Sequence, residues 1–270
     1  MTNPAEILPG MIFYSYLSSE RKEKVCFWDH HTLVLMVSGH FTLDTLEQHV
    51  SMDGGEMLLI RKNQLGTLCK TPLPGQNYET IVISLHEELL RKIALEEKLE
   101  TDKKYIGPSN ILIPNNEYLQ GYFQSILPYV RSSVNELTEE MGILKIKEVF
   151  KLLLLVMPGL RNFLLDFSDP SKIDLERFMI SNFKFNVPVD KFAQLTGRSL
   201  AGFKRDFQKT FGTSPRHWLQ EKRLMEAKHL LESKHKNASA IYLELGFESL
   251  SHFSHSFKKR FGKSPSSIVS

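Results

Sequence analysis

Cationic side chains gather in the C-terminal third of the chain, where they could bind a polyanion. Residues 172–270 hold 18 Lys and Arg against 9 Asp and Glu, whereas residues 1–171 hold 16 against 22. The net charge of the whole chain is only +3, so the near-neutral total hides a basic part joined to an acidic one. A basic region of this kind is typical of proteins that bind nucleic acid, although a solvated lysine-rich surface is the simpler alternative.

Patterns that would support catalysis do not occur in the sequence. We find no Gly-rich phosphate loop, no G-x-S-x-G turn and no paired-carboxylate signature. Cys26 and Cys69 are isolated thiols without C-x-x-C spacing, which fits a reducing cytoplasm and indicates neither a disulfide framework nor a zinc site. We therefore expect no enzyme and no cofactor.

The elements that carry the basic residues form a unit that occurs twice. Residues 199–215 (SLAGFKRDFQKTFGTSP) recur as residues 249–265 (SLSHFSHSFKKRFGKSP), with nine of seventeen positions identical. The repeated Phe residues fall four apart, so they share one helix face, which predicts a buried face. Gly212 and Gly262 predict the helix ends, and Ser-Pro at 214 and 264 predicts the start of a following helix.

A second, shorter helical pattern precedes each copy. It ends in Thr196-Gly197-Arg198 before the first copy and in Gly246-Phe247-Glu248 before the second. A helix, a tight Gly-containing turn and a second helix are typical of a helix-turn-helix, predicted here at about 188–211 and about 238–261. A plain helical repeat with inert surfaces is the alternative, and the charge favours DNA binding.

Residues 182–268 resemble the DNA-binding domain of the AraC/XylS family of bacterial transcription regulators. The resemblance is carried by FAQLTGRSLAGFKRDF in the first unit and by LGFESLSHFSHSFKKRFGKSP in the second, with RLMEAKHLL at 223–231 similar to the family's linker helix. Tyr242 departs from the pattern, because the family commonly has Ala there. The resemblance implies that the partner is double-stranded DNA.

Helix geometry predicts which side chains would face the DNA. With Phe203 and Phe207 turned inward, the outward positions are Ala201, Lys204, Arg205 and Gln208, and in the second helix Ser251, His252, Ser254, His255 and Lys258. The resemblance implies base contacts by Ala201, Lys204, Arg205, Ser251, His252 and His255, to which we add Gln208. Arg can pair bidentately with guanine, whereas Ala can only touch a thymine methyl group. Relatives frequently have Arg at the position of His255, so the base preference there should be softer.

A further set of cations lies at helix ends or flanks and is expected to contact phosphates, which fix register without reading sequence. The set is Arg198, Lys209, Arg216, Lys258, Lys259, Arg260 and Lys263. The helix from Pro215 to about Glu232 would be roughly 27 Å long at ~1.5 Å per residue. It could hold two recognition helices about one DNA turn, ~34 Å, apart.

Residues 10–85 contain frequent short strand patterns with Gly and Pro turns, which predict a small barrel or sandwich. SGHFTL followed by GGEMLLIR is loosely similar to the cupin-like regulatory barrel of the family. His30, His31, His40 and His49 lie in or beside these strands, but no H-x-H with a following Glu occurs. We expect surface or hydrogen-bonded histidines and no metal.

Residues 86–165 change to a helical period. The helix predicted at 137–155 is more apolar than one buried face requires. In related regulators, helices at this place form the dimer contact, so we predict homodimerisation here, with an internal core as the open alternative.

The sequence thus predicts an α+β protein of two domains. Residues 1–165 form a regulatory and dimerisation domain, with a cupin-like β-barrel at 10–85 and helices at 86–165. Residues 166–172 are the linker, and residues 173–270 form an all-α domain of two helix-turn-helix units joined by a linker helix. No export signal or membrane span is apparent, which predicts a cytoplasmic protein.

The predicted function is that of a sequence-specific transcription regulator that inserts two recognition helices into successive major grooves. Its partners would be duplex DNA, a second copy, RNA polymerase if it activates, and an effector at the N-terminal domain. The alternatives are a non-specific architectural DNA binder and a cupin-type metal enzyme fused to a DNA-targeting module.

Overall fold

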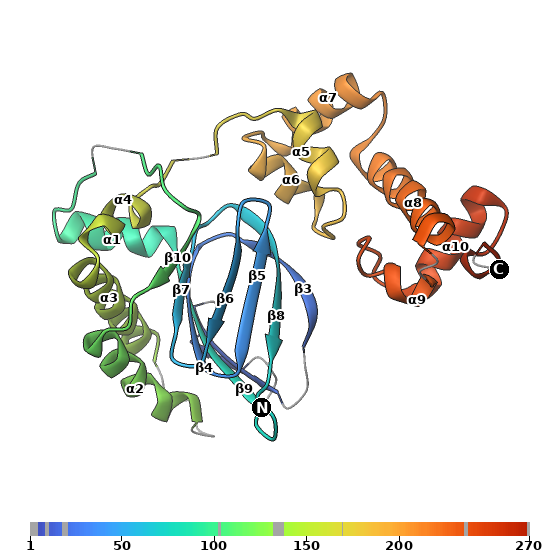
Figure 1. Ribbon diagram of the computed structural model, residues 1–270. Coiled ribbons are helices and arrows are strands. Elements are labelled where there is room, and N and C mark those ends of the chain that lie inside the picture. The colour runs from blue at the N-terminus through green and yellow to red at the C-terminus, as the bar shows by residue number, and fades with distance from the viewer. Residues whose placement is uncertain are drawn as a thin grey trace. The chain divides into compact units, whose positions relative to one another are not determined.

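The computed structural model describes residues 5–8, 11–17, 21–101, 104–131, 138–168, 170–234 and 237–268. The chain divides into two compact units, Met1–Ser168 and Asp169–Ser270. Strands and helices make up the first unit, and helices make up the described part of the second (Figure 1).

The strands of the first unit form two antiparallel sheets. The six-stranded sheet has the order β1-β2-β9-β4-β7-β10, with β1 at Ala5–Leu8, β2 at Ile12–Leu17, β9 at Tyr78–Leu85, β4 at His31–Ser38, β7 at Met57–Ile60 and β10 at Asn110–Ile113. The four-stranded sheet has the order β3-β8-β5-β6, with β3 at Arg21–Trp28, β8 at Gln64–Thr71, β5 at His40–Thr45 and β6 at His49–Asp53. Among the described strands no ladder joins the two sheets, so a closed cupin-like barrel is not confirmed.

The six-stranded sheet is buried on both faces at its centre. On β4, Val34 and Met36 pack against the four-stranded sheet, whereas Leu33 and Leu35 pack against helices. On β7, Leu58 likewise packs against the four-stranded sheet and Leu59 against the helices. Because side chains alternate along a strand, two covered faces require the nearly continuous apolar runs of β4 and β7.

Helices cover the outer face of the six-stranded sheet. They are α1 at Glu87–Glu96, α2 at Glu117–Arg131, α3 at Glu139–Val156, the 3-10 turn η1 at Pro158–Leu160, and α4 at Arg161–Leu164 (Figure 1). On α3, Ile146, Val149, Phe150 and Leu153 are buried in the shared core, whereas Leu144 and Leu155 are exposed. The apolar excess of this helix is therefore both internal core and exposed surface.

The second unit places two helix pairs on either side of a long helix. Its elements are α5 at Leu175–Asn182, α6 at Val189–Leu195, α7 at Leu200–Phe211, α8 at Pro215–Lys234, α9 at Ala238–Ile241, α10 at Leu250–Phe261 and the 3-10 turn η2 at Pro265–Ser267. The first helix pair is α6 and α7, the second is α9 and α10, and the long helix is α8. The core of the second pair joins Leu224 and Ala227 of α8 to Phe253 and Phe257 of α10. Helix α8 thus supplies part of the core on which α10 rests.

Candidate nucleic-acid interface

Helices α7 and α10 begin and end in the same way because their sequences repeat. Ser199 caps α7 by accepting a hydrogen bond from the Gly202 amide at 3.2 Å, and Ser249 caps α10 by accepting one from the His252 amide at 3.2 Å. Gly212 and Gly262 end the helices with φ of 69° and 75°. This left-handed conformation favours glycine, so the predicted helix ends are confirmed.

The repeated phenylalanines fix the rotation of each helix. Phe203 and Phe207 of α7 are fully buried, and so are Phe253 and Phe257 of α10. Phe207 also packs edge-on against Trp218 of α8, with ring centroids 5.7 Å apart. The face opposite the phenylalanines must therefore point to solvent, which makes it available to a ligand as large as a duplex.

On α7 the four outward side chains predicted from spacing, Ala201, Lys204, Arg205 and Gln208, are all exposed. They present one methyl group, two cations and one amide along a single helix face. Arg and Lys donate to guanine edges and phosphates, and Gln pairs with adenine, so this face has the donors that major-groove recognition requires.

Helix α10 presents a less cationic face. Ser251, His252, His255 and Lys258 are exposed, whereas Ser254 is half-buried. The ring of His252 lies against Phe247, with centroids 6.0 Å apart, which restricts its orientation. The donors of this face are mainly hydroxyl and imidazole groups rather than guanidinium groups.

The cations predicted to contact phosphates divide into two groups. Lys209, Arg216, Lys258, Lys259 and Lys263 are exposed. The other two have protein partners: Arg260 donates to Glu221 of α8 at 2.6 Å, and Arg198 is buried apart from 10% of its side chain. A phosphate contact stays a prediction for all seven, and the structure gives it least room at Arg198.

Arg198 instead fastens the segment before α5 to the first helix pair. It donates to the Asp206 carboxylate at 3.0 Å, to the Ile173 carbonyl at 3.0 Å and to the Thr196 carbonyl at 2.7 Å. Lys172 pairs with the same Asp206 carboxylate at 3.2 Å. Two cations at Asp206 hold the pKa of its carboxyl below the ordinary value.

The turn between α6 and α7 requires a glycine for two reasons. Gly197 has a φ of +65°, and a Cβ there would lie 2.5 Å from the Pro170 carbonyl oxygen. The segment at 170–172 therefore lies directly on this turn, and Gly197 is required both by that contact and by its backbone conformation.

A groove of about 800 Å³ separates the two helix pairs beside α8. Lys204 and Gln208 of α7 line it, together with Arg216 of α8 and His252 of α10. The groove thus brings outward residues of α7 and α10 to one concave surface. Sequence reasoning missed Arg223, which lies in this groove and binds backbone carbonyls up to 40 residues away.

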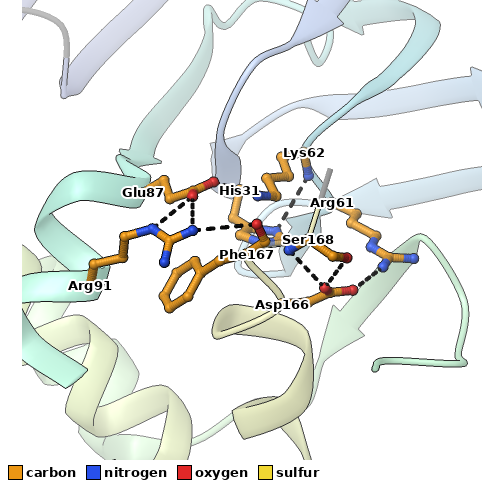
Figure 2. A network of polar contacts seen from close by, with 8 residues as sticks. All are labelled: His31, Arg61, Lys62, Glu87, Arg91, Asp166, Phe167 and Ser168. Atoms are coloured by element: carbon orange, nitrogen blue, oxygen red, sulfur yellow. Dashed lines mark hydrogen bonds and ion pairs between the residues drawn. The ribbon is translucent and has the colours of Figure 1, made fainter. Parts of the chain in front are cut away.

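The first unit holds a separate polar network at its C-terminal end (Figure 2). Asp166 accepts hydrogen bonds from Arg61 and from the amide and hydroxyl of Ser168. Burial opposes ionisation of Asp166, but these hydrogen bonds and the Arg61 charge hold the pKa of its carboxyl below the ordinary value. The last residues of the unit are thereby fastened to the turn after β7.

Helix α1 contributes the other half of the network (Figure 2). Glu87 binds both Lys62 and Arg91. Arg91 lies over the Phe167 ring, 4.2 Å from its centroid, and donates to the Phe167 carbonyl at 3.4 Å. Residues 166–168 are therefore held from two sides within the first unit.

The four histidines named as metal candidates have protein contacts of several kinds. His40 pairs with Asp53 at 2.7 Å, His49 pairs with Asp44 at 2.6 Å, and His30 stacks on His86 with centroids 4.0 Å apart. His31 is buried and accepts from the Lys62 amide at 3.3 Å. Across the described ranges no three His, Cys, Asp or Glu side chains gather in a metal-binding group. Nor does any described helix have the length and apolar character needed to cross a membrane.

Both halves of the chain match known protein families. Residues 31–162 match the ExsA N-terminal regulatory domain, and residues 192–269 match a helix-turn-helix domain. The virulence regulon transcriptional activator VirF of Yersinia enterocolitica is 28% identical over 87% of this chain and 87% of its own length. The transcriptional regulator ExsA of Pseudomonas aeruginosa is 26% identical over 86% and 83%. Among solved structures, ToxT from Vibrio cholerae covers 96% of this chain and 98% of its own, with 16% identity and a TM-score of 0.43.

The duplicated helix-turn-helix and the family matches define the class of the protein: it is a DNA-binding transcription regulator. More narrowly, the chain belongs to the AraC family, with VirF and ExsA among its relatives over the length of both units. The predicted family and function are therefore confirmed, and neither the enzyme nor the architectural alternative finds support in these matches.

Proposed function

We propose that α7 and α10 enter two successive major grooves of promoter DNA and read its sequence. The observation that carries this proposal is the duplicated outward face, exposed on both helices because the phenylalanines behind it are buried. Helix α8 has 20 residues, which at ~1.5 Å per residue gives about 30 Å. That length suits two recognition helices about one DNA turn, ~34 Å, apart.

We assign base contacts to Ala201, Lys204, Arg205, Gln208, Ser251, His252 and His255. The exposed cations of the flanks, Lys209, Arg216, Lys258, Lys259 and Lys263, are the proposed phosphate contacts, joined by Arg260 and Arg198 if DNA displaces their carboxylate partners. Phosphate contacts would hold the module on any duplex, whereas the base contacts would select the operator.

Residues 173–270 would be the DNA-binding domain and residues 166–172 the linker, with residues 1–165 as the regulatory domain. We infer that the regulatory domain, with its cupin-like pair of sheets, responds to an effector, and that the protein acts in the cytoplasm without enzymatic activity. Because its relative VirF is described as an activator, we propose that this chain also activates transcription through contact with RNA polymerase.

Dimerisation through α3 is part of the proposal. Leu144 and Leu155 are 64% and 63% exposed. They lie eleven residues apart, about three turns, and so share one stripe of the helix. A second copy would bury both side chains, and two DNA-binding modules on one operator would raise the overall affinity.

Binding titrations at several salt concentrations test the proposed function. A 40-base-pair duplex selected by the protein from a random library is compared with an unselected duplex. Specific recognition predicts that the selected duplex binds more tightly by at least about a thousandfold at physiological salt. Equal affinity for both duplexes, falling steeply with salt, would instead indicate an architectural binder.

A further inference from the structure

Arg223 of α8 joins the segment before the first helix pair to the turn of the second pair through backbone carbonyls. Its Nε donates to the Phe183 carbonyl at 2.8 Å and its Nη2 donates to the Phe185 carbonyl at 2.9 Å, both in the segment that follows α5. Its Nη1 donates to the Gly246 carbonyl at 3.0 Å, in the turn between α9 and α10. One guanidinium group therefore binds both the segment that leads into the first helix pair and the turn within the second pair.

The turn at Gly246 lies directly against the segment between α5 and α6, which leads into the first helix pair. Gly246 has a φ of +77°, and a Cβ at this position would lie 2.5 Å from the Lys184 carbonyl oxygen and 3.0 Å from the Arg223 Cζ. A contact this close leaves no room for a side chain. The two loops that approach each other beside α8 in Figure 1 are thus the 183–186 segment and the Gly246 turn.

The planar guanidinium group of Arg223 can fix the relative orientation of the segments that it binds. Its N–H groups project in one rigid plane, so three bonds to three carbonyls determine both a distance and an orientation. Burial lowers the pKa of Arg223 to about 10, so the group is still charged at neutral pH and its hydrogen bonds are charge-assisted. A lysine at this position has a single ammonium group and could not satisfy the same three acceptors.

We propose that Arg223 and Gly246 form a clamp that sets the separation and rotation between α7 and α10, and so determines which half-site spacing the protein accepts. This inference rests on the proposed reading of two successive grooves. Arg223 is a positioning residue, because its three donors are directed to the protein backbone and it acts on DNA only through the two helices. Operator spacing then becomes a property of a half-buried contact within the protein rather than of the base-contacting side chains.

Selection from a random library tests the clamp, with the full chain as wild type and as Arg223→Gln. The wild type should enrich two sequence blocks at one separation. One added base pair rotates the second block by about 35° and shifts it by ~3.4 Å, which should weaken wild-type binding by about tenfold or more. Arg223→Gln should enrich the same two blocks at several separations and lose most of that discrimination.

The readout is the ratio of affinities for two spacings, which a smaller folded fraction does not change. Lys222→Gln is the matched control, because it removes a cation from the exposed side of the same helix turn and should keep the wild-type ratio. If Arg223→Gln does not fold, Arg223→Lys replaces it, since Lys keeps the charge and the aliphatic stem while losing the planar fork.

The outcomes separate the clamp from the function on which it rests. If the wild type selects two sequence blocks at one separation and Arg223→Gln selects the same blocks at that same separation, the clamp is wrong but the reading of two grooves stands. A uniform loss at every spacing with a shallower salt dependence would make Arg223 a phosphate contact and also overturn it. A wild-type pool without two separated blocks would overturn the reading of two grooves, and the clamp with it.

Discussion

His31 gives the first unit a specific sensitivity to acid. Its side chain is 2% exposed, packs against Phe163 with ring centroids 4.8 Å apart, and accepts from the Lys62 amide through Nδ1. Burial, reinforced by the charges of Lys62 and Arg61, lowers the pKa of His31 to about 3. The imidazole therefore stays neutral in the folded unit where an unfolded chain would protonate it.

The sign and size of the effect follow from proton linkage. An unfolded histidine has a pKa of about 6.5, so between about pH 6.5 and pH 3 the unfolded chain binds one more proton than the folded unit. Below about pH 6.5 the free energy of unfolding therefore falls by about 1.4 kcal/mol for each unit by which the pH is lowered. Because the effect begins only near pH 6.5, lowering the pH from 7 to 5 removes about 2 kcal/mol. Below about pH 3 both states are protonated and this contribution stops changing.

Urea unfolding of the full chain measures this effect if the signal comes from the first unit alone. The chain has two tryptophans, so Trp218→Phe leaves Trp28, which is buried between the sheets, as the reporter. In that background His31→Asn, whose amide oxygen can still accept from the Lys62 amide, should remove about 2 kcal/mol of the change between pH 7 and pH 5. The same substitution at the exposed His49 is the control. If wild type and His31→Asn lose stability in parallel over this range, the reasoning about His31 is refuted.

Three further predictions concern DNA binding, assembly and packing. Arg205→Ala should weaken binding to a selected duplex by about 1–3 kcal/mol and relax the preference at one base position, whereas Lys209→Ala should weaken binding to every duplex and lower the salt slope by about one phosphate contact. Titrations at several salt concentrations measure both effects. If Arg205→Ala lowers the affinity for selected and random duplexes equally, Arg205 does not read a base. The double change Leu144→Glu and Leu155→Glu should make the protein monomeric in sedimentation at tens of micromolar, because it places charges in the proposed dimer contact; a monomeric wild type would contradict the dimer. Tyr242→Ala should lower the free energy of unfolding of the second unit by about 1–3 kcal/mol, since the half-buried ring packs against the core of α9 and α10, and a loss below about 0.5 kcal/mol in thermal unfolding would place the ring on the rim.

The exposed face of α7 could be predicted from the sequence because its signals are local. Phe203 and Phe207 lie one helical turn apart, and Gly212 ends the same helix, so spacing alone determines which side chains point outward. The exposure of Lys204 and Arg205 follows from these positions without knowledge of the rest of the fold.

The strands at sheet edges could not be predicted in the same way. Strand β3 at Arg21–Trp28 is an edge strand that begins with four charged residues, so its sequence lacks a clear apolar alternation. Strand β6 at His49–Asp53 is also an edge strand; its residues alternate, but with only two apolar side chains the signal is short. Strand β10 at Asn110–Ile113 follows a Gly-Pro-Ser turn and pairs with β7, about fifty residues earlier in the chain. Its four residues are a strand only because that partner is present.

The contacts of Arg223 and Gly197 were missed for a related reason. The partners of Arg223 are carbonyl oxygens near residues 183–185 and 246, and a backbone carbonyl leaves no mark on the sequence. Gly197 is distinctive in sequence, but the segment at 170–172 that packs on it is not. A sequence therefore predicts faces of helices better than it predicts the contacts that hold helices at a distance.

Guanine N7 protection on the selected duplex is the most direct test of the central claim that α7 and α10 read two successive major grooves. The wild-type chain should protect major-groove positions in two blocks about one helical turn, ~34 Å, apart on one face of the duplex. Arg205→Ala should weaken protection in the block read by α7 and leave the other block in place. A single protected block, or protection confined to the minor groove, would contradict the account.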